Sequence, residues 1–96
     1  MAEYRLSPIA QRDLDEVFDY TVVQWGLPQA LRYTDLIEAA CAVLADAPQH
    51  AQDCSDIRPG YRRRSVEQHV VYFRPTRDGI VVVRILHHRM DAGRHL

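Results

Sequence analysis

The chain has 96 residues, of which 47% are apolar and 26% are charged, so residues 1–96 are expected to form one domain whose core needs no metal or disulfide. The formal net charge of −1 excludes a uniformly basic protein. The charge is unevenly distributed, because residues 1–57 carry a net −7 and residues 58–96 a net +6. Residues 58–96 are therefore the candidate region for binding anionic partners. The stretch MAEYRLSPIA has no signal-peptide regions, and no apolar run approaches ~18 residues, so we expect a cytoplasmic protein that does not span a membrane.

A short strand and a first helix are predicted at the start of the chain. Residues 3–6, EYRL, predict the strand. Ser7 and Pro8 are typical of a helix start, because serine caps the first turn and proline suits the first helical position. Apolar positions recur at helical spacing up to Gly26, where the helix is expected to end. This face consists of Ala10, Leu14, Val17, Phe18, Thr21 and Trp25.

A second helix is predicted from Pro28 to about Ala47, and so short a connection between two helices predicts an antiparallel hairpin. Its apolar residues, counted from Val43 and Leu36 round to Cys41, cover roughly 160° at ~100° per residue. One buried face needs only about 100°. The excess either faces the first helix or is covered by a partner. The expected inner face is Ala30, Tyr33, Ile37, Ala40, Cys41 and Leu44.

Three strands are predicted after a polar connection at residues 48–60. They occupy residues 61–67, 69–74 and 80–88, and Asp78-Gly79 is a typical hairpin turn between the last two. The order β-α-α-β-β-β predicts an α+β fold, with a helical hairpin packed on one face of an antiparallel sheet.

Alternation of side chains assigns the strand faces. The set expected to face the helices is Val71, Phe73, Val81, Val83 and Ile85. The set expected on the opposite face is Tyr72, Arg74, Arg84 and His88. In the stretch GYRRR, Arg62 and Arg64 share one face and Arg63 takes the other. One of these arginines is a candidate partner for an acidic helix residue, Asp13 or Glu16.

Metal and thiol chemistry find little support in the sequence. His87 and His88 are adjacent on a predicted strand and should point to opposite faces, while His50 and His95 add no known ligand spacing. Cys41 and Cys54 lie 13 positions apart, outside any CxxC motif. We therefore expect free thiols, no metal site and no cofactor.

Two other functions remain open for the basic sheet face. The acid, base and charge stabilisation for RNA cleavage could come from Tyr72, Arg74, Arg84 and either His87 or His88. The face could also contact phosphates, although Tyr72 alone is a poor base-stacking platform. A solvated basic surface is the simplest interpretation.

Several motifs resemble the ParE toxins of the RelE/ParE superfamily. They are the helix LSPIAQRDLDEVFDYTVVQWG, the strands GYRRRSVEQHVVYFRP and the end GIVVVRILHHRMDAGRHL. Gly60 and Arg62 match a family Gly-x-Arg, residues 69–74 match its second meander strand, and residues 84–91 match its end. The stretch at residues 63–65 departs from the family, where a less basic and more apolar sequence is common.

The resemblance implies the toxin of a type II toxin–antitoxin system that poisons DNA gyrase and blocks replication without being an enzyme. The alternative is a RelE-type ribosome-dependent mRNA endonuclease with Tyr72, Arg84 and His87 in its site. The ending of the chain and the absence of lysine favour gyrase as the target.

The resemblance also implies partners and surfaces. A ParD-like antitoxin would wrap the toxin with a C-terminal arm, in part acidic, and this chain alone would not bind DNA sequence-specifically. The expected antitoxin-binding residues are Trp25, Tyr33, Leu36 and Val43. The expected target-binding residues are Arg62, Arg74, Arg84, His87, Arg89 and Arg94.

Overall fold

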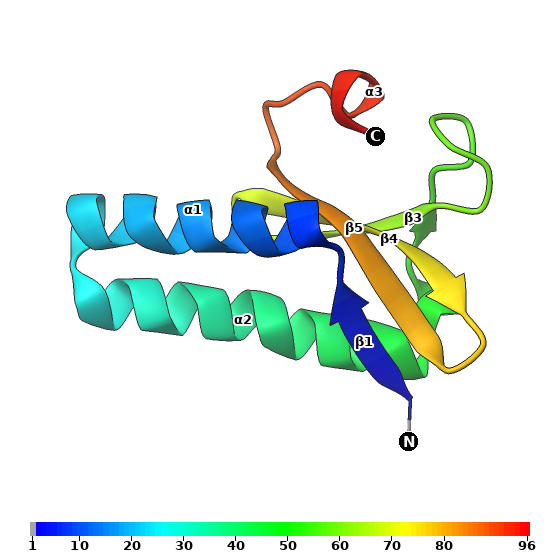
Figure 1. Ribbon diagram of the computed structural model, residues 1–96, viewed down its shortest axis with the longest axis horizontal. Helices are drawn as coiled ribbons and strands as arrows, with labels where there is room; N and C mark the ends of the chain where they lie inside the picture. The colour runs from blue at the N-terminus through cyan, green and yellow to red at the C-terminus, as the bar shows by residue number, and fades with distance from the viewer. Residues whose placement is uncertain (1) are drawn as a thin grey trace.

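The computed structural model describes residues 2–96 and contains a helical hairpin, a five-stranded sheet and a short C-terminal helix (Figure 1). The order of the long elements is β-α-α-β-β-β, as predicted. The elements are β1 Glu3–Leu6, α1 Pro8–Trp25, α2 Leu27–Asp46, the 3-10 helix η1 Pro48–His50, β2 Gln52–Asp53, β3 Arg62–Val66, β4 His69–Thr76, β5 Gly79–His87 and α3 Ala92–His95.

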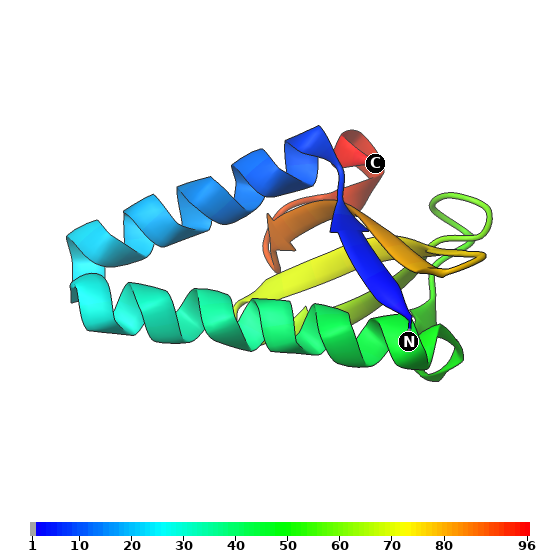
Figure 2. The same ribbon diagram turned by 60° about the horizontal axis from the view of Figure 1, so that its bottom comes forward.

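The predicted helix boundaries are confirmed. The Ser7 hydroxyl accepts a hydrogen bond from the backbone N–H of Ala10 at 3.0 Å and caps α1. Gly26 ends α1 with a φ of 92°, which glycine adopts readily. The tip of the hairpin projects beyond the strands (Figures 1 and 2). Side chains at this tip consequently lack a sheet to pack on, and Trp25, predicted on the inner face of α1, is 74% exposed.

The sheet has the order β1-β5-β4-β3-β2. β3, β4 and β5 form the predicted antiparallel meander. β1, however, pairs in parallel with β5, so the sheet is mixed rather than wholly antiparallel. The polar connection contributes η1 and the two-residue strand β2, neither of which was predicted because both are too short to show a period.

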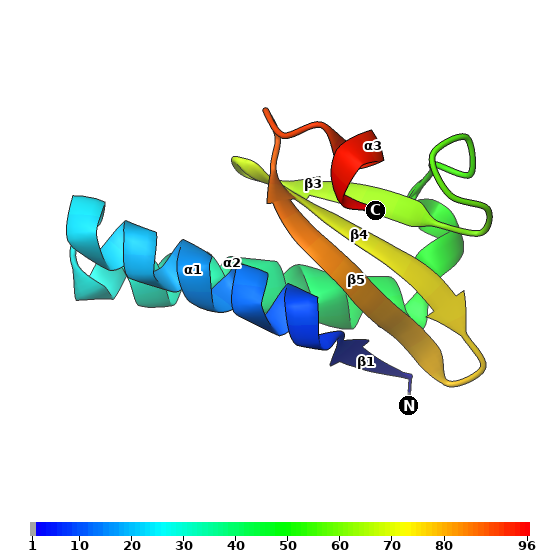
Figure 3. The same cartoon turned by 45° about the horizontal axis from the view of Figure 1, so that its top comes forward.

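Each face of the sheet carries its own apolar cluster. The helices cover one face, where the largest fully buried side chains include Phe73, Ile37 and Leu44. The other face is covered by the loop after β2 and by α3 (Figure 3), and its buried residues are Cys54, Val70, Tyr72, Leu86 and Ala92. The prediction of an open, basic face containing Tyr72 is therefore wrong, since Tyr72 is only 4% exposed.

A bulge in β5 changes which side chains reach the helices. Tyr72 lies opposite Arg84 but Phe73 lies opposite Val82, so Val83 is an extra residue on the β5 side. Ile85 and Phe73 face the helices as predicted. Val83 instead packs against the second cluster, and Val81 is absent from the helix-side core. The prediction for these two valines is wrong, and Ile80 and Val82 take their places.

Cys41 and Cys54 are free and buried, one in each apolar cluster. Among residues 2–96 no helix combines the length and the apolar character required to cross a bilayer.

Candidate functional site

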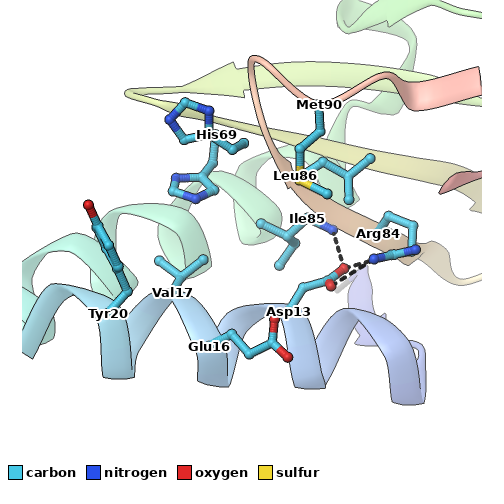
Figure 4. A pocket seen from close by; sticks show the side chains of 10 residues that line it. Asp13, Glu16, Val17, Tyr20, His69, Arg84, Ile85, Leu86 and Met90 are labelled. Carbon is cyan, nitrogen blue, oxygen red and sulfur yellow. Dashed lines mark hydrogen bonds and ion pairs between the residues drawn. The ribbon is translucent and has the colours of Figure 1, made fainter. Parts of the chain in front are cut away.

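A buried ion pair joins α1 to β5 at one end of the candidate site (Figure 4). Arg84 donates from Nε to Asp13 Oδ2 at 2.8 Å and from Nη2 to Oδ1 at 3.0 Å. The backbone N–H of Ile85 donates to the same carboxylate at 2.9 Å. Asp13 is 8% exposed. Its buried negative charge is stabilised by these three hydrogen bonds. Hydrogen bonding to Asp13 raises the pKa of Arg84, and the charges of Asp13 and Glu16 add to this effect.

Arg84 also holds the C-terminal tail. Its Nη1 donates to the carbonyl of His95 at 3.2 Å, and Arg58 donates to the carbonyl of Leu96 at 3.1 Å. Arg84 thus links α1, β5 and the tail that covers the second cluster. One prediction is wrong here: the partner of Asp13 is Arg84 rather than an arginine of GYRRR.

An aromatic and histidine cluster lies at the far end of β4 and β5. The rings of His69 and His87 are 5.4 Å apart, and His87 stacks on His88 at 4.4 Å. The prediction that His87 and His88 point to opposite faces is wrong, because β5 ends at His87 and the chain turns there. The Met90 N–H donates to the His87 carbonyl at 2.9 Å and closes this turn.

Tyr33 contacts the buried ring of His69. The Tyr33 hydroxyl accepts from the backbone N–H of Gln68 at 3.0 Å and lies 2.7 Å from His69 Nδ1. The Tyr33 hydroxyl therefore bridges the Gln68 backbone and the His69 ring. Burial, together with the neighbouring His87 and His88, lowers the pKa of His69 to about 4. His69 is therefore neutral at pH 7.

Acidification should destabilise the fold through His69. The unfolded chain binds this proton at about pH 6.5 and the folded chain only at about pH 4, so the free energy of unfolding falls as the pH drops through this window. The loss is at most roughly 3 kcal/mol. Urea unfolding at pH 7 and pH 4.5 should show a smaller loss for His69→Gln than for the wild type. An equal loss in the two proteins would contradict the assignment.

A groove runs between α1, the start of α2 and the ends of β4 and β5. It contains two adjoining hollows of about 320 and 330 Å³, both lined by Tyr20, His69 and His87. The first also contains Asp13 and Glu16, and the second is lined by Trp25, Tyr33 and Gln68 among others. Figure 4 shows the side chains of α1 and β5 converging on the first hollow. Tyr20 is 65% exposed, which makes the groove accessible and strongly aromatic.

The predicted site residues do not form one surface. Trp25, Tyr33 and His87 line the groove. Leu36 and Val43 are 41% and 63% exposed, and they lie a whole number of helical turns apart on the outside of α2. Leu36 and Val43 therefore belong to a part of the wide apolar stripe of α2 that the first helix does not cover.

The predicted basic residues are likewise dispersed. Arg62 donates to the carbonyl of Ala51 at 2.9 Å, a structural contact. Arg74 and Arg89 are exposed, and Arg94 is exposed with only a long ion pair of 3.8 Å to Asp91. Tyr72 and His87 lie on opposite faces of the sheet, so the group expected for RNA cleavage is not assembled.

Sequence reasoning missed several groove residues. Asp13 was predicted only as a candidate ion-pair partner, although a carboxylate between Ala10 and Val17 interrupts the apolar face of α1. The roles of Tyr20 and His69 depend on how the strand ends approach the hairpin, and no local pattern marks them.

A helical hairpin packed on one face of a mixed sheet is the RelE/ParE-like architecture. The chain resembles the solved structure described as the chromosomal ParDE TA system from P. aeruginosa, with a TM-score of 0.77 and 25% identity over 91% of this chain and 96% of that chain. The family model described as ParE toxin of type II toxin-antitoxin system, parDE, matches residues 4–92.

Curated relatives match the chain over most of its length. The chain is 42% identical to Toxin ParE1 of Mycobacterium tuberculosis (strain ATCC 25618 / H37Rv), covering 99% of this chain and 98% of that protein. It is 36% identical to Toxin ParE1 of Caulobacter vibrioides over 100% of this chain and 99% of that protein. It is also 36% identical to Toxin ParE of Escherichia coli, covering 95% and 89%. The chain belongs to the ParE toxin family of type II toxin–antitoxin systems.

Proposed function

We propose that this ParE-family toxin poisons DNA gyrase and is neutralised by a ParD-like antitoxin. The full-length identity of 42% to a protein named Toxin ParE1 supports the choice of branch within the RelE/ParE superfamily. The observation that carries the proposal is the match of the ParE toxin family model to residues 4–92. The sheet also separates Tyr72 from His87, so the three residues expected for RNA cleavage do not come together.

A poison needs a complementary surface rather than proton-transfer groups. Arg74, Arg89 and His87 are the proposed target contacts, together with Arg94, because their side chains are free of buried structural bonds. Arg84 and Arg62 are better assigned to the fold, since their guanidinium groups bond Asp13 and the carbonyl of Ala51.

The antitoxin is proposed to bind the helical hairpin. The groove lined by Trp25 and Tyr33 and the outer face of α2 at Leu36 and Val43 present apolar surface of the kind that an amphipathic arm covers. The P. aeruginosa relative was solved as a ParDE system, which supports a partner of this kind.

Induction of the toxin without antitoxin tests the target in cells. We expect DNA-damage signalling and filamentation, with ribosome-bound mRNA left intact. The lesion should vanish in cells whose gyrase has been altered so that it cannot be trapped. Codon-specific cleavage of mRNA on purified ribosomes, abolished by His87→Ala, would instead support the endonuclease alternative.

Point variants locate the target contacts better than truncation. Removing the tail from Arg89 onward would expose the second apolar cluster, because α3 covers it. Arg89→Gln and Arg94→Gln should lower toxicity while the melting temperature and antitoxin binding stay near those of the wild type.

A further inference from the structure

We infer that the groove receives a lysine or arginine side chain of the antitoxin arm, held between the carboxylate of Glu16 and the ring of Tyr20. The inference rests on the proposed function, because the occupant is the arm of the antitoxin. The net charge of +6 on residues 58–96 predicts that an acidic part of the arm binds the toxin. The inference here is the opposite for the groove, which is expected to bind a basic side chain.

The charges inside the groove favour a cation. Asp13 and Arg84 neutralise each other through two hydrogen bonds. Burial keeps His69 neutral at pH 7 by lowering its pKa to about 4, and it also lowers the pKa of His87. Glu16 lines the same hollow and has neither an ion pair nor a hydrogen bond within the described part of the chain. The groove therefore has one uncompensated negative charge, although β5 belongs to the cationic part of the sequence.

The aromatic side chains favour the same occupant. Tyr20 lies one helical turn after Glu16 on α1, so the two side chains are neighbours on one helix face. A guanidinium or ammonium over a tyrosine ring gains about 0.5–1 kcal/mol at an exposed site, and more when water is excluded. Trp25, 74% exposed, offers a second aromatic surface at the tip end of the groove.

The dimensions of the groove suit a short helical segment. It follows α1 from Asp13 to Trp25, which is about 18 Å at 1.5 Å per residue. A segment of about twelve residues covers this length. Apolar side chains at helical spacing would enter the two hollows of about 320 and 330 Å³, and one basic side chain at the rim would reach Glu16.

Titration of a ParD-like antitoxin into toxin variants tests the inference. Glu16→Gln should weaken binding about tenfold, and Glu16→Lys about a hundredfold. Asp19→Asn is the matched control, since Asp19 is an exposed carboxylate of the same helix outside the groove. It should bind within twofold of the wild type. The affinity of Glu16→Gln should also depend less on salt, because one screened charge pair has been removed.

Charge reversal on the other side gives the decisive comparison. Each lysine and arginine of the arm is changed to glutamate in turn, and one of these variants should restore tight binding to Glu16→Lys. Unchanged affinity of Glu16→Gln and Glu16→Lys, or tighter binding by Glu16→Lys, would overturn the inference while leaving the antitoxin proposal intact. If the antitoxin does not bind the wild-type toxin at all, the proposed function itself fails.

Discussion

Replacing Arg84 by methionine should lower the free energy of unfolding by about 3–5 kcal/mol, the range found when one partner of a buried ion pair is removed. The substitution leaves the Asp13 carboxylate, which is 8% exposed, with only the backbone N–H of Ile85 as a donor. It also releases the carbonyl of His95 in the tail. Chemical denaturation of the wild type and the variant gives the difference directly.

Two further variants separate charge from packing. Arg89→Met removes an exposed arginine and should change stability by less than about 0.5 kcal/mol. Asp13→Leu combined with Arg84→Met removes both buried charges and should recover part of the lost stability, since the backbone N–H of Ile85 still loses its acceptor. A loss below 1 kcal/mol for Arg84→Met alone would show that the pair is weak. If the loss is large, reduced toxicity of Arg84 variants reflects unfolding rather than a missing target contact.

Shortening Ile85 to alanine should cost roughly 2–5 kcal/mol, because the side chain is 3% exposed in the helix-side core and the deletion leaves a cavity. Val83→Ala should cost clearly less, since Val83 is only partly buried against the second cluster. The comparison tests the bulge, which places these two residues on different faces of the sheet. Similar losses for both variants would contradict this placement.

Local patterns were sufficient to predict most of the fold. The Ser7-Pro8 start, the Gly26 stop and the Asp78-Gly79 turn each reflect backbone chemistry that acts over a few residues, and the structure confirms the elements that they delimit. The face of Ile85 was predicted correctly from the alternation of side chains along the strand. The faces of Val81 and Val83 were not, because an extra residue in β5 shifts the alternation and leaves no mark in the sequence.

The candidate site depends on contacts between residues far apart in the chain. Asp13 and Arg84 are 71 positions apart, and Tyr33 and His69 are 36 apart. The last residues of the chain fold over the second apolar cluster, and no local pattern predicted this. The resemblance to ParE toxins identified the family without revealing this arrangement, and Leu36, Val43 and the exposed arginines remain predictions for partner binding.

The reaction of purified DNA gyrase with supercoiled plasmid tests the central claim most directly. With the toxin present, linear plasmid should accumulate after denaturation of the enzyme, because the cleaved complex is trapped. Prior addition of the antitoxin should prevent this. Unchanged gyrase cleavage and supercoiling, at toxin concentrations that cut ribosome-bound mRNA, would contradict the account.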